Sequence, residues 1–512
     1  MAKPQSASRL GASEAKAQGV RLRRSGEALV RKGRLREAID RFAAALEALP
    51  GDLPTLFHLA RTADRLGMAD GAIRFYEQIL AQAPDQREAV VNLSHAYRSA
   101  GRGSEAVRLL QDALSRREDD PSLWHALGSA KRETADREGA RVCFTRALEC
   151  DPRHGGAAGS LADLDLEEGH TEDALTRYDV AVRNTDRGTR MGAQMRLSHA
   201  LALLQAGRLA EGWTAYGARF AAQGAREGSA ADRRLKRWTG QSLKGRPLKI
   251  LAEQGVGDQL MFAACLPAVL SAPAREAGPV SLTCEPRLAP LLARSLPGVD
   301  VHATGSDDPG GAPGYWSAPL ADMPARLWPE RAAPLTNDPF LRIDPVEAAR
   351  WRAWLDSAGP GPHIGLCWRS GRRDGLRGDQ YAPFEAWIGL ARRLRGTLVC
   401  VQYDAAGAEI AAMAQADLAL HQPPDLDQKQ DIDRATALLS VLDRVITAPT
   451  AVAYQAALAG TRTIRLLPFA WWTHLGTGRD AFAPALEDRV APRPGLWDDT
   501  MDTLAASLAN TA

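Results

Sequence analysis

The chain has 512 residues, more than one hydrophobic core can organise, so we expect several domains. Its 64 lysines and arginines nearly balance its 62 aspartates and glutamates, which argues against a general attraction to nucleic acid. The polar segment Met1–Arg24 lacks the apolar stretch of a secretory signal, and no apolar run reaches the roughly 20 residues that span a bilayer. The six cysteines form no Cys-x-x-Cys pair and are typical of reduced thiols. We therefore expect a cytoplasmic protein without a transmembrane segment.

The first part of the chain repeats itself every 34 residues. Small residues recur in this register at Ala38, Ala72, Ala106, Ala140 and Ala174, and large ones follow four positions later at Phe42, Tyr76, Leu110, Phe144 and Tyr178. Five positions before the alanines stand Gly33, Gly67, Gly101, Ala135 and Gly169. Small residues allow two helices to cross closely, and large residues fill the space to the next helix pair. We interpret all these residues as core.

This pattern resembles the tetratricopeptide (TPR) repeat. It predicts a polar tail over 1–18, five TPR repeats over 19–186 and a divergent sixth helical repeat over 187–222. Stacked helix pairs form a concave groove that binds a peptide or protein. Candidate groove residues are His58, Arg61, Asn92, Arg98 and His125, although each also fits a solvated helix face.

The second part alternates strand-like and helix-like runs, which predicts parallel sheets with crossover helices. Small and polar residues over 223–245 indicate a linker, and Trp238 is expected to anchor its end on the next domain. We expect one lobe over 246–345, an interlobe helix and linker over 346–362, and a second lobe over 363–512. Within the first lobe, the Gly/Pro-rich stretch Gly305–Pro319 is predicted to be a surface loop.

The stretch Leu248–Pro267 contains the first chemical candidate. An apolar strand is followed by a turn with Gly255 and Gly257, and then by residues at helical spacing. Asp258 opens this helix at the carboxyl edge of the sheet, where ligands bind in such folds. It is a candidate general base, and equally a helix cap. The two glycines would let a substrate approach the backbone, or serve only the turn.

The run Glu253-Gln254-Gly255-Val256-Gly257-Asp258 resembles the opening of bacterial glycosyltransferases of the heptosyltransferase-like GT-B type coupled to TPR repeats. The strand and loop Ile364–Gly371 and the strand, turn and helix Leu442–Gly460 are similar to the start of the second lobe and its donor-binding unit. The resemblance implies two Rossmann-like lobes and an inverting mechanism. Within this group the arrangement is similar to flagellin glycosyltransferases, in which the repeats bind flagellin and the lobes add a nonulosonic sugar.

The donor side of the predicted site combines two strand ends and a helix start. Thr450 and the amides near Ala451 lie at a helix N-terminus, which favours binding of an anion. Arg369 and Ser370 leave a strand and could reach the same phosphate. A surface arginine is the alternative for Arg369, but its place at a strand end favours the functional role. Gln402 ends another strand and could recognise a base or sugar edge.

Two positions depart from the family's donor turn, where an Asp and a His are usual. Here Pro449 replaces the Asp and Tyr454 the His. One explanation is a donor with a single phosphate, such as a CMP-linked sugar; another is an inactive lobe that serves as a scaffold. Two Asp-x-Asp triplets, Asp425–Asp427 and Asp431–Asp433, are better explained by loop solvation and helix capping than by a metal. We therefore expect neither a metal nor a resident cofactor.

The leading hypothesis is a cytoplasmic protein O-glycosyltransferase that captures flagellin through its repeats and uses a nucleotide-activated sugar. The acceptor-side loop would be Glu253, Gln254, Gly255 and Gly257, with Asp258 as base. Two alternatives stay open. One is a TPR adaptor or chaperone with a degenerate transferase domain, and the other is a transferase for a lipid or polysaccharide acceptor.

Overall fold

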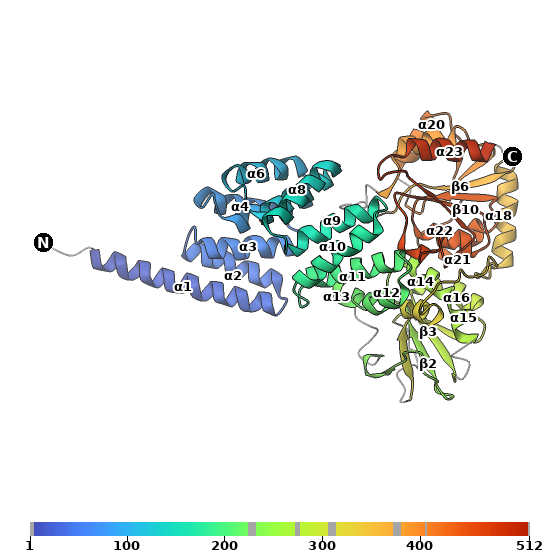
Figure 1. Ribbon diagram of the computed structural model, residues 1–512, viewed down its shortest axis with the longest axis horizontal. Coiled ribbons are helices and arrows are strands. Elements are labelled where there is room, and N and C mark those ends of the chain that lie inside the picture. Colours follow the sequence, from blue (N-terminus) through green and yellow to red (C-terminus); the bar gives the residue numbers. More distant parts are fainter. Residues whose placement is uncertain are drawn as a thin grey trace. The chain divides into compact units, whose positions relative to one another are not determined.

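The computed structural model describes residues 5–223, 232–271, 277–305, 314–371, 380–404 and 407–509. The chain divides into two compact units, Met1–Leu161 and Ala162–Ala512. The first is built from helices, and the second joins further helices to two parallel sheets (Figure 1). The predicted fold class, a TPR array followed by an α/β region with two Rossmann-like lobes, is confirmed.

The first unit consists of antiparallel helix pairs. Its helices are α1 (Gln5–Arg31), α2 (Leu35–Ala48), α3 (Leu53–Arg65), α4 (Ala69–Gln82), α5 (Arg87–Ser99), α6 (Gly103–Arg116), α7 (Pro121–Glu133) and α8 (Arg137–Cys150). Helix α9 (Gly155–Glu167) begins in this unit and ends in the second. Helix α1 includes residues 5–18, for which the sequence predicts a polar tail ahead of the repeats.

The packing follows the 34-residue register of the sequence. The five register alanines, Ala38 to Ala174, are completely buried, and the five large residues that follow them are at most 1% exposed. Gly33, Gly67, Gly101 and Gly169 have φ between +73° and +83°, a left-handed conformation that ends each first helix of a pair. Ala135 adopts the same conformation at φ +63°. The predicted core role is confirmed for the register alanines and the large residues. It is wrong for the four glycines and Ala135, which are exposed because they form the turns between helices.

The second unit begins with the last repeat helices, α10 (Thr171–Asn184), α11 (Arg190–Gln205), α12 (Leu209–Tyr216) and α13 (Arg219–Gln223). Helix α11 has 16 residues, whereas α3, α5, α7 and α9 have 13 each. In the sequence, Gly169 and Gly207 are 38 residues apart instead of the 34 of the earlier repeats. The three extra residues of α11 account for most of this difference.

The first sheet has the order β1-β5-β2-β3-β4, and all its pairings are parallel. Its strands are β1 (Lys236–Arg237), β2 (Leu248–Leu251), β3 (Val280–Cys284), β4 (Val299–Ala303) and β5 (Trp316–Pro319). Its helices are α14 (Val256–Ala263), α15 (Leu266–Ser271), α16 (Ala289–Ser295) and α17 (Met323–Leu327), with the short 3₁₀ turns η1 (Asp232–Arg234), η2 (Pro286–Leu288) and η4 (Leu320–Asp322).

Strand β5 corrects one expectation. The sequence predicts a surface loop over Gly305–Pro319, but the end of this stretch is a buried strand between β1 and β2. The apolar residues Trp316 and Ala318 pack in the core, and this burial outweighs the glycine and proline content of the stretch. Residues 306–313 of the predicted loop lie outside the described residues.

The second sheet has the order β11-β10-β9-β6-β7-β8 and is also parallel. Its strands are β6 (His363–Cys367), β7 (Thr397–Cys400), β8 (Leu420–His421), β9 (Arg444–Thr447), β10 (Thr463–Leu467) and β11 (Leu486–Val490). The helices are α18 (Pro345–Ala358), α19 (Phe384–Ala391), α20 (Gly407–Gln415), α21 (Ile432–Leu439), α22 (Ala451–Leu458) and α23 (Asp498–Ala509), with the 3₁₀ turn η6 (Trp472–His474).

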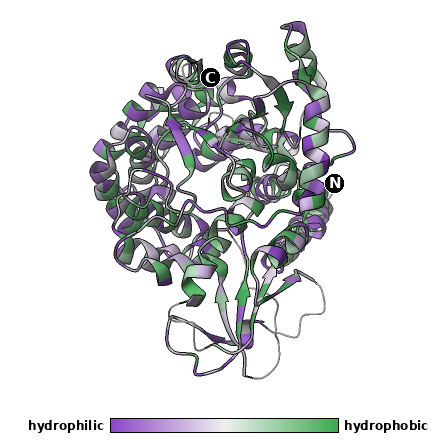
Figure 2. Ribbon diagram, turned by 90° about the vertical axis from the view of Figure 1, so that its right-hand side faces the viewer, coloured by the Kyte–Doolittle hydropathy of each residue, from purple (hydrophilic) through white to green (hydrophobic). Residues whose placement is uncertain are grey.

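One hydrophobic core joins parts of the second unit that are far apart in the sequence. It includes Leu204 of α11, Tyr216 of α12, Phe262 of α14 and Ala453 of α22. The expected anchor Trp238 is fully buried in this core, which confirms that prediction. Many of the helices carry both hydrophobic and hydrophilic residues along their length (Figure 2). The last repeat helices and the two lobes are therefore packed as one body.

Candidate functional site

The predicted acceptor-side loop joins β2 to α14 and has an unusual backbone. Gln254 has φ +72°, in the left-handed region that residues other than glycine rarely adopt. Its side-chain amide donates to the hydroxyl of Tyr216 at 3.1 Å, and its carbonyl accepts from Gln259 Nε2, also at 3.1 Å. Such strained residues cluster at functional sites because the surrounding contacts hold them in place.

Asp258 lies in the first turn of α14 and is partly exposed. Its Oδ2 accepts from the backbone N–H of Gly255 at 3.2 Å. Gly255 is the N-cap of α14, so Asp258 caps the helix from its third position and not as the N-cap residue. The carboxylate remains at the carboxyl edge of the first sheet, directly after β2. The same position of the carboxylate serves helix capping and is compatible with a role as general base. The catalytic role remains a prediction.

Glu253 faces the last repeat helices. Its Oε1 accepts from Arg219 Nη2 at 2.8 Å, and the same nitrogen donates to Asp322 Oδ1 at 2.8 Å. Arg219 is 1% exposed, and its guanidinium lies 4.7 Å from the ring centre of Tyr216. Burial raises the pKa of Glu253, although the neighbouring Arg219 partly offsets this. Glu253 therefore ties the loop to α13 and η4.

The two predicted halves of the site meet at Gly257 and Ala451. A side chain at Gly257 would put its Cβ 3.2 Å from Ala451 Cα, so any other residue would require α14 and α22 to move apart by a few tenths of an ångström. Thr450 precedes α22 in an extended conformation, and its side chain does not cap the helix. The hydroxyl of Thr450 instead lies 3.3 Å from that of Thr447. The first amides of α22 thus have no side-chain cap from Thr450.

Three further donor-side candidates are held by contacts within the second lobe. Arg369 donates from Nε and Nη2 to the carboxylate of Glu409, at 2.6 Å each. Gln402 is 2% exposed and bonds three times to the backbone of residues 368 and 369, at 2.9–3.1 Å. Ser370 accepts from the hydroxyl of Tyr403 at 3.1 Å. Gln402 therefore shapes the loop after β6, while a donor contact of Arg369 or Ser370 remains a prediction.

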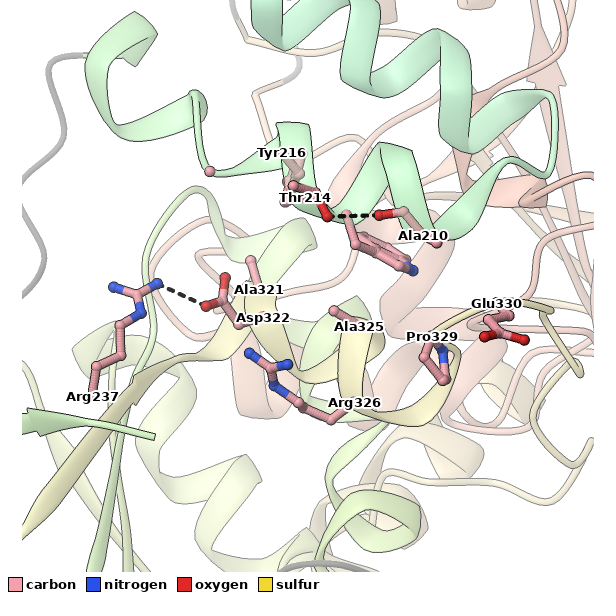
Figure 3. Close-up of a pocket in the computed structure, with 12 residues that line it drawn as sticks. Ala210, Thr214, Tyr216, Arg237, Ala321, Asp322, Ala325, Arg326, Pro329 and Glu330 are labelled. Atoms are coloured by element: carbon pink, nitrogen blue, oxygen red, sulfur yellow. Dashed lines mark hydrogen bonds and ion pairs between the residues drawn. The ribbon is translucent and has the colours of Figure 1, made fainter. Parts of the chain in front are cut away.

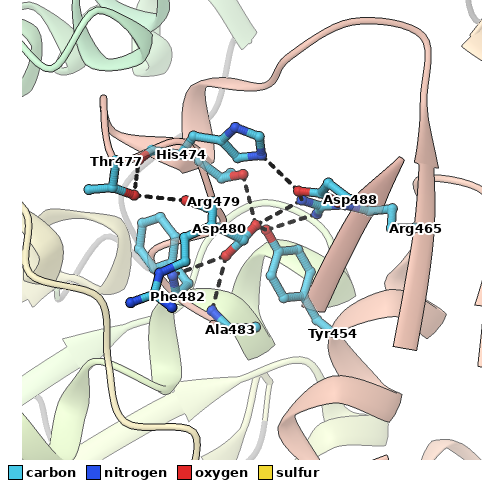
Figure 4. A network of polar contacts seen from close by, with 10 residues as sticks. Tyr454, Arg465, His474, Thr477, Arg479, Asp480, Phe482, Ala483 and Asp488 are labelled. Atoms are coloured by element: carbon cyan, nitrogen blue, oxygen red, sulfur yellow. Dashed lines mark hydrogen bonds and ion pairs between the residues drawn. The ribbon is translucent and has the colours of Figure 1, made fainter. Parts of the chain in front are cut away.

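Tyr454 points into a buried polar network (Figure 4). Its hydroxyl donates to Asp480 Oδ2 at 2.7 Å, and burial raises its pKa. Arg465 is 1% exposed and donates to Asp480 and to both carboxylate oxygens of Asp488, at 2.8–2.9 Å. His474 Nε2 lies 2.7 Å from Asp488 Oδ2. Tyr454 thus anchors α22 to β10 and β11.

Sequence reasoning did not identify Tyr216, Arg219 and Asp322 as neighbours of the acceptor-side loop. Arg219 contacts a carboxylate 34 residues away and another 103 residues away. Because these contacts join residues far apart in the chain, no local pattern in a single sequence reports them.

Three of the predicted groove residues, Arg98, His125 and His58, contact other side chains of the first unit. Arg98 donates from Nε to Glu133 Oε2 at 2.8 Å, and a second contact from Nη2 completes the pair. His125 lies 3.2 Å from Ser160 Oγ, and burial lowers its pKa to about 3. His58 stacks on Phe42. His125 is therefore a partly buried side chain that is neutral at neutral pH.

Among the described residues, no group of three or more His, Cys, Asp or Glu side chains is arranged to hold a metal ion. None of the described helices is both long and apolar enough to cross a membrane.

Comparison with known proteins places the chain in a family. A tetratricopeptide repeat model matches residues 65–130. Over 485 residues, the chain is 33% identical to "Protein FlbA" of Caulobacter vibrioides, an alignment that covers 92% of this chain and 81% of that protein. The chain belongs to the FlbA family. Because the alignment is so long, the FlbA relationship includes the α/β lobes as well as the repeats.

Other similarities concern a smaller share of the chain. Human "Tetratricopeptide repeat protein 7B" is 27% identical over 127 residues, which are 25% of this chain and 15% of that protein. Among solved structures, a thermophilic TPR protein of Thermus thermophilus is 26% identical, with 36% of this chain and 99% of that chain covered, at a TM-score of 0.31. The FlbA relationship is thus far more extensive than either of these.

Proposed function

We propose that this FlbA-family protein is a cytoplasmic protein O-glycosyltransferase that modifies flagellin with a nucleotide-activated sugar. In this proposal the TPR array captures flagellin and the two lobes transfer the sugar. The supporting observation is the close approach of Gly257 to Ala451, because it brings the acceptor-side loop of one lobe to the donor-side helix of the other. Both elements follow the carboxyl ends of parallel strands, where ligands bind in such folds.

The proposed chemistry is a single displacement with inversion. Asp258 accepts the proton of a flagellin Ser or Thr hydroxyl, and the hydroxyl oxygen forms a bond to the anomeric carbon of the sugar. The nucleotide leaves with the electron pair of the broken bond, and the amides at the start of α22 stabilise its phosphate. Tyr454 is turned toward Asp480 and away from this role. A donor with one phosphate, such as a CMP-linked nonulosonic acid, suits a site that uses backbone amides.

The deciding experiment is the intact mass of flagellin from a strain lacking this protein. We expect the mass to fall by the sum of the attached sugars and to return with the wild-type gene. Asp258→Asn should leave flagellin unmodified, whereas the control Asp338→Asn, at an exposed position, should restore the full mass. An unchanged mass in the deletion strain would refute the flagellin assignment. Full modification by Asp258→Asn would refute Asp258 as the base.

A second candidate function is an adaptor whose lobes no longer transfer sugar. The bidentate pair of Arg369 with Glu409 favours it, because both side chains are at most 14% exposed and Arg369 would have to leave Glu409 to bind a phosphate fully. This candidate predicts that deletion changes the amount or export of flagellin and leaves its mass unchanged. The same mass measurement therefore separates the two functions.

A further inference from the structure

A polar pocket lies beside the acceptor-side loop, between the last repeat helix and the first lobe. Its volume is about 470 Å³, within the range of pockets that hold small ligands or a few side chains. Helix α12 supplies Trp213, Thr214 and Tyr216, and the segment from η4 to Glu330 forms the opposite wall. The pocket belongs entirely to the second unit.

The pocket is physically joined to the acceptor-side loop. Tyr216 lines it and accepts the hydrogen bond from Gln254, the residue with the left-handed backbone. Asp322 also lines it and shares Arg219 with Glu253. A molecule seated in the pocket would therefore touch two of the groups that fix the loop carrying Asp258.

Within the described ranges, the pocket's Asp322 is engaged in ion pairs, whereas Arg326 is in none. Asp322 is paired with Arg219 and, at 2.7 Å, with Arg237. Arg326 lines the pocket, and its Nε is buried without a hydrogen-bond partner among the described residues. Figure 3 shows Arg326 between the Arg237–Asp322 pair and Glu330, which lies toward the other end of the pocket. This nitrogen has almost no accessible surface, so a ligand would meet the exposed part of the half-buried Arg326 side chain, with whose positive charge a carboxylate would pair.

We propose that this pocket binds an acidic segment of the protein acceptor, with a carboxylate on Arg326 and apolar groups against Trp213 and Tyr216. The inference rests on the proposed function, since it names the subsite that presents the acceptor hydroxyl to Asp258. The chain would thus hold flagellin at two places, the TPR groove and this pocket. The pocket would select which residue is modified.

The test compares full-length Arg326→Gln with wild type, using flagellin purified from the deletion strain as the probe. Flagellin binding is first measured without any donor. Sugar transfer is then measured at several flagellin concentrations, with extract of the deletion strain as the donor source. We expect Arg326→Gln to weaken binding and to raise the KM for flagellin about tenfold, the loss of one charged hydrogen bond, with kcat unchanged. Arg326→Lys should recover part of this loss.

Two matched variants support the measurement. Arg331→Gln removes an exposed arginine outside the pocket and should behave as wild type. Ala325→Trp fills the pocket without changing charge and should also weaken flagellin binding. Added salt should weaken binding by wild type more than by Arg326→Gln, because screening acts on the proposed ion pair.

The outcomes separate this inference from the proposed function. If wild type transfers sugar and Arg326→Gln has the same KM for flagellin, the pocket inference is wrong and the function stands. If wild type binds flagellin without transferring sugar and Arg326→Gln weakens binding, the pocket stands and the enzyme assignment fails. If Arg326→Gln instead weakens binding of CMP and leaves flagellin binding intact, the pocket serves the donor and the inference is overturned. Failure of wild type to bind flagellin overturns both.

Discussion

Arg465→Met should strongly destabilise the second unit. Arg465 is 1% exposed and lies between Asp480, which is fully buried, and Asp488, which is 7% exposed. Removing the guanidinium leaves two buried carboxylates, and breaking a buried ion pair from one side costs about 3–5 kcal/mol. Tyr454 and His474 still contact the two carboxylates, which keeps the loss within this range.

Thermal unfolding followed by tryptophan fluorescence measures this loss. Of the 12 tryptophans only Trp124 lies in the first unit, so the signal reports mainly on the second. In a unit of this size, about 2 °C per kcal/mol is expected, which gives a fall of about 6–10 °C in the unfolding midpoint. The control Arg489→Met removes a half-exposed arginine paired with Glu487 and should cost less than about 1 kcal/mol. A fall for Arg465→Met no larger than for this control would refute the reasoning.

Three further predictions concern packing and pH. Gly128→Ala would place its Cβ 2.5 Å from the ring of Phe144 and should destabilise the first unit by about 1–3 kcal/mol, measured by urea unfolding followed by circular dichroism. Gly257→Val should force α14 away from Ala451, lowering both the unfolding midpoint and the transfer of sugar; unchanged transfer would separate this contact from function. Burial raises the pKa of Asp488, but its guanidinium and imidazole neighbours lower it more, so the net pKa is below the usual 3.8. The stability it contributes should be complete above that value and lost as the pH falls through the lower, folded-state pKa, and an Asp488→Asn variant should lack this acid-side loss.

The repeats could be predicted from the sequence because each register position has one physical requirement. A fully buried crossing point accepts only a small residue such as Ala38, and a left-handed turn favours glycine. The strands β3, β6, β9 and β10 can also be recognised in the sequence, since each coincides with an apolar run flanked by turn residues. Strand β11 cannot be recognised in the sequence in the same way. Its buried residue Asp488 is polar because it pairs with Arg465, so the strand lacks an apolar run.

The candidate site was less predictable, since its character depends on pairings across the fold. Arg369 follows strand β6, as expected, but its partner Glu409 lies 40 residues further on and binds its guanidinium. Gln402 likewise follows a strand, yet its amide is used by the backbone of the neighbouring loop. From the sequence, one can identify polar residues that follow a strand and therefore lie near the carboxyl edge of the sheet. Which of them remain available to a ligand depends on contacts that a sequence does not list.

Strand β1 has a practical consequence for dividing the protein into fragments. Lys236 and Arg237 come from the stretch that the sequence suggests is a linker, yet they pair with β5, and the adjacent Trp238 is fully buried. A fragment starting at residue 246 would lose this edge strand and leave a large apolar hole. It would also lose Arg219, and with it the ion pair that fixes Glu253. The two α/β lobes should therefore be produced together with the last repeat helices. A hybrid that joins these lobes to another repeat array should keep α10–α13 as part of the α/β half.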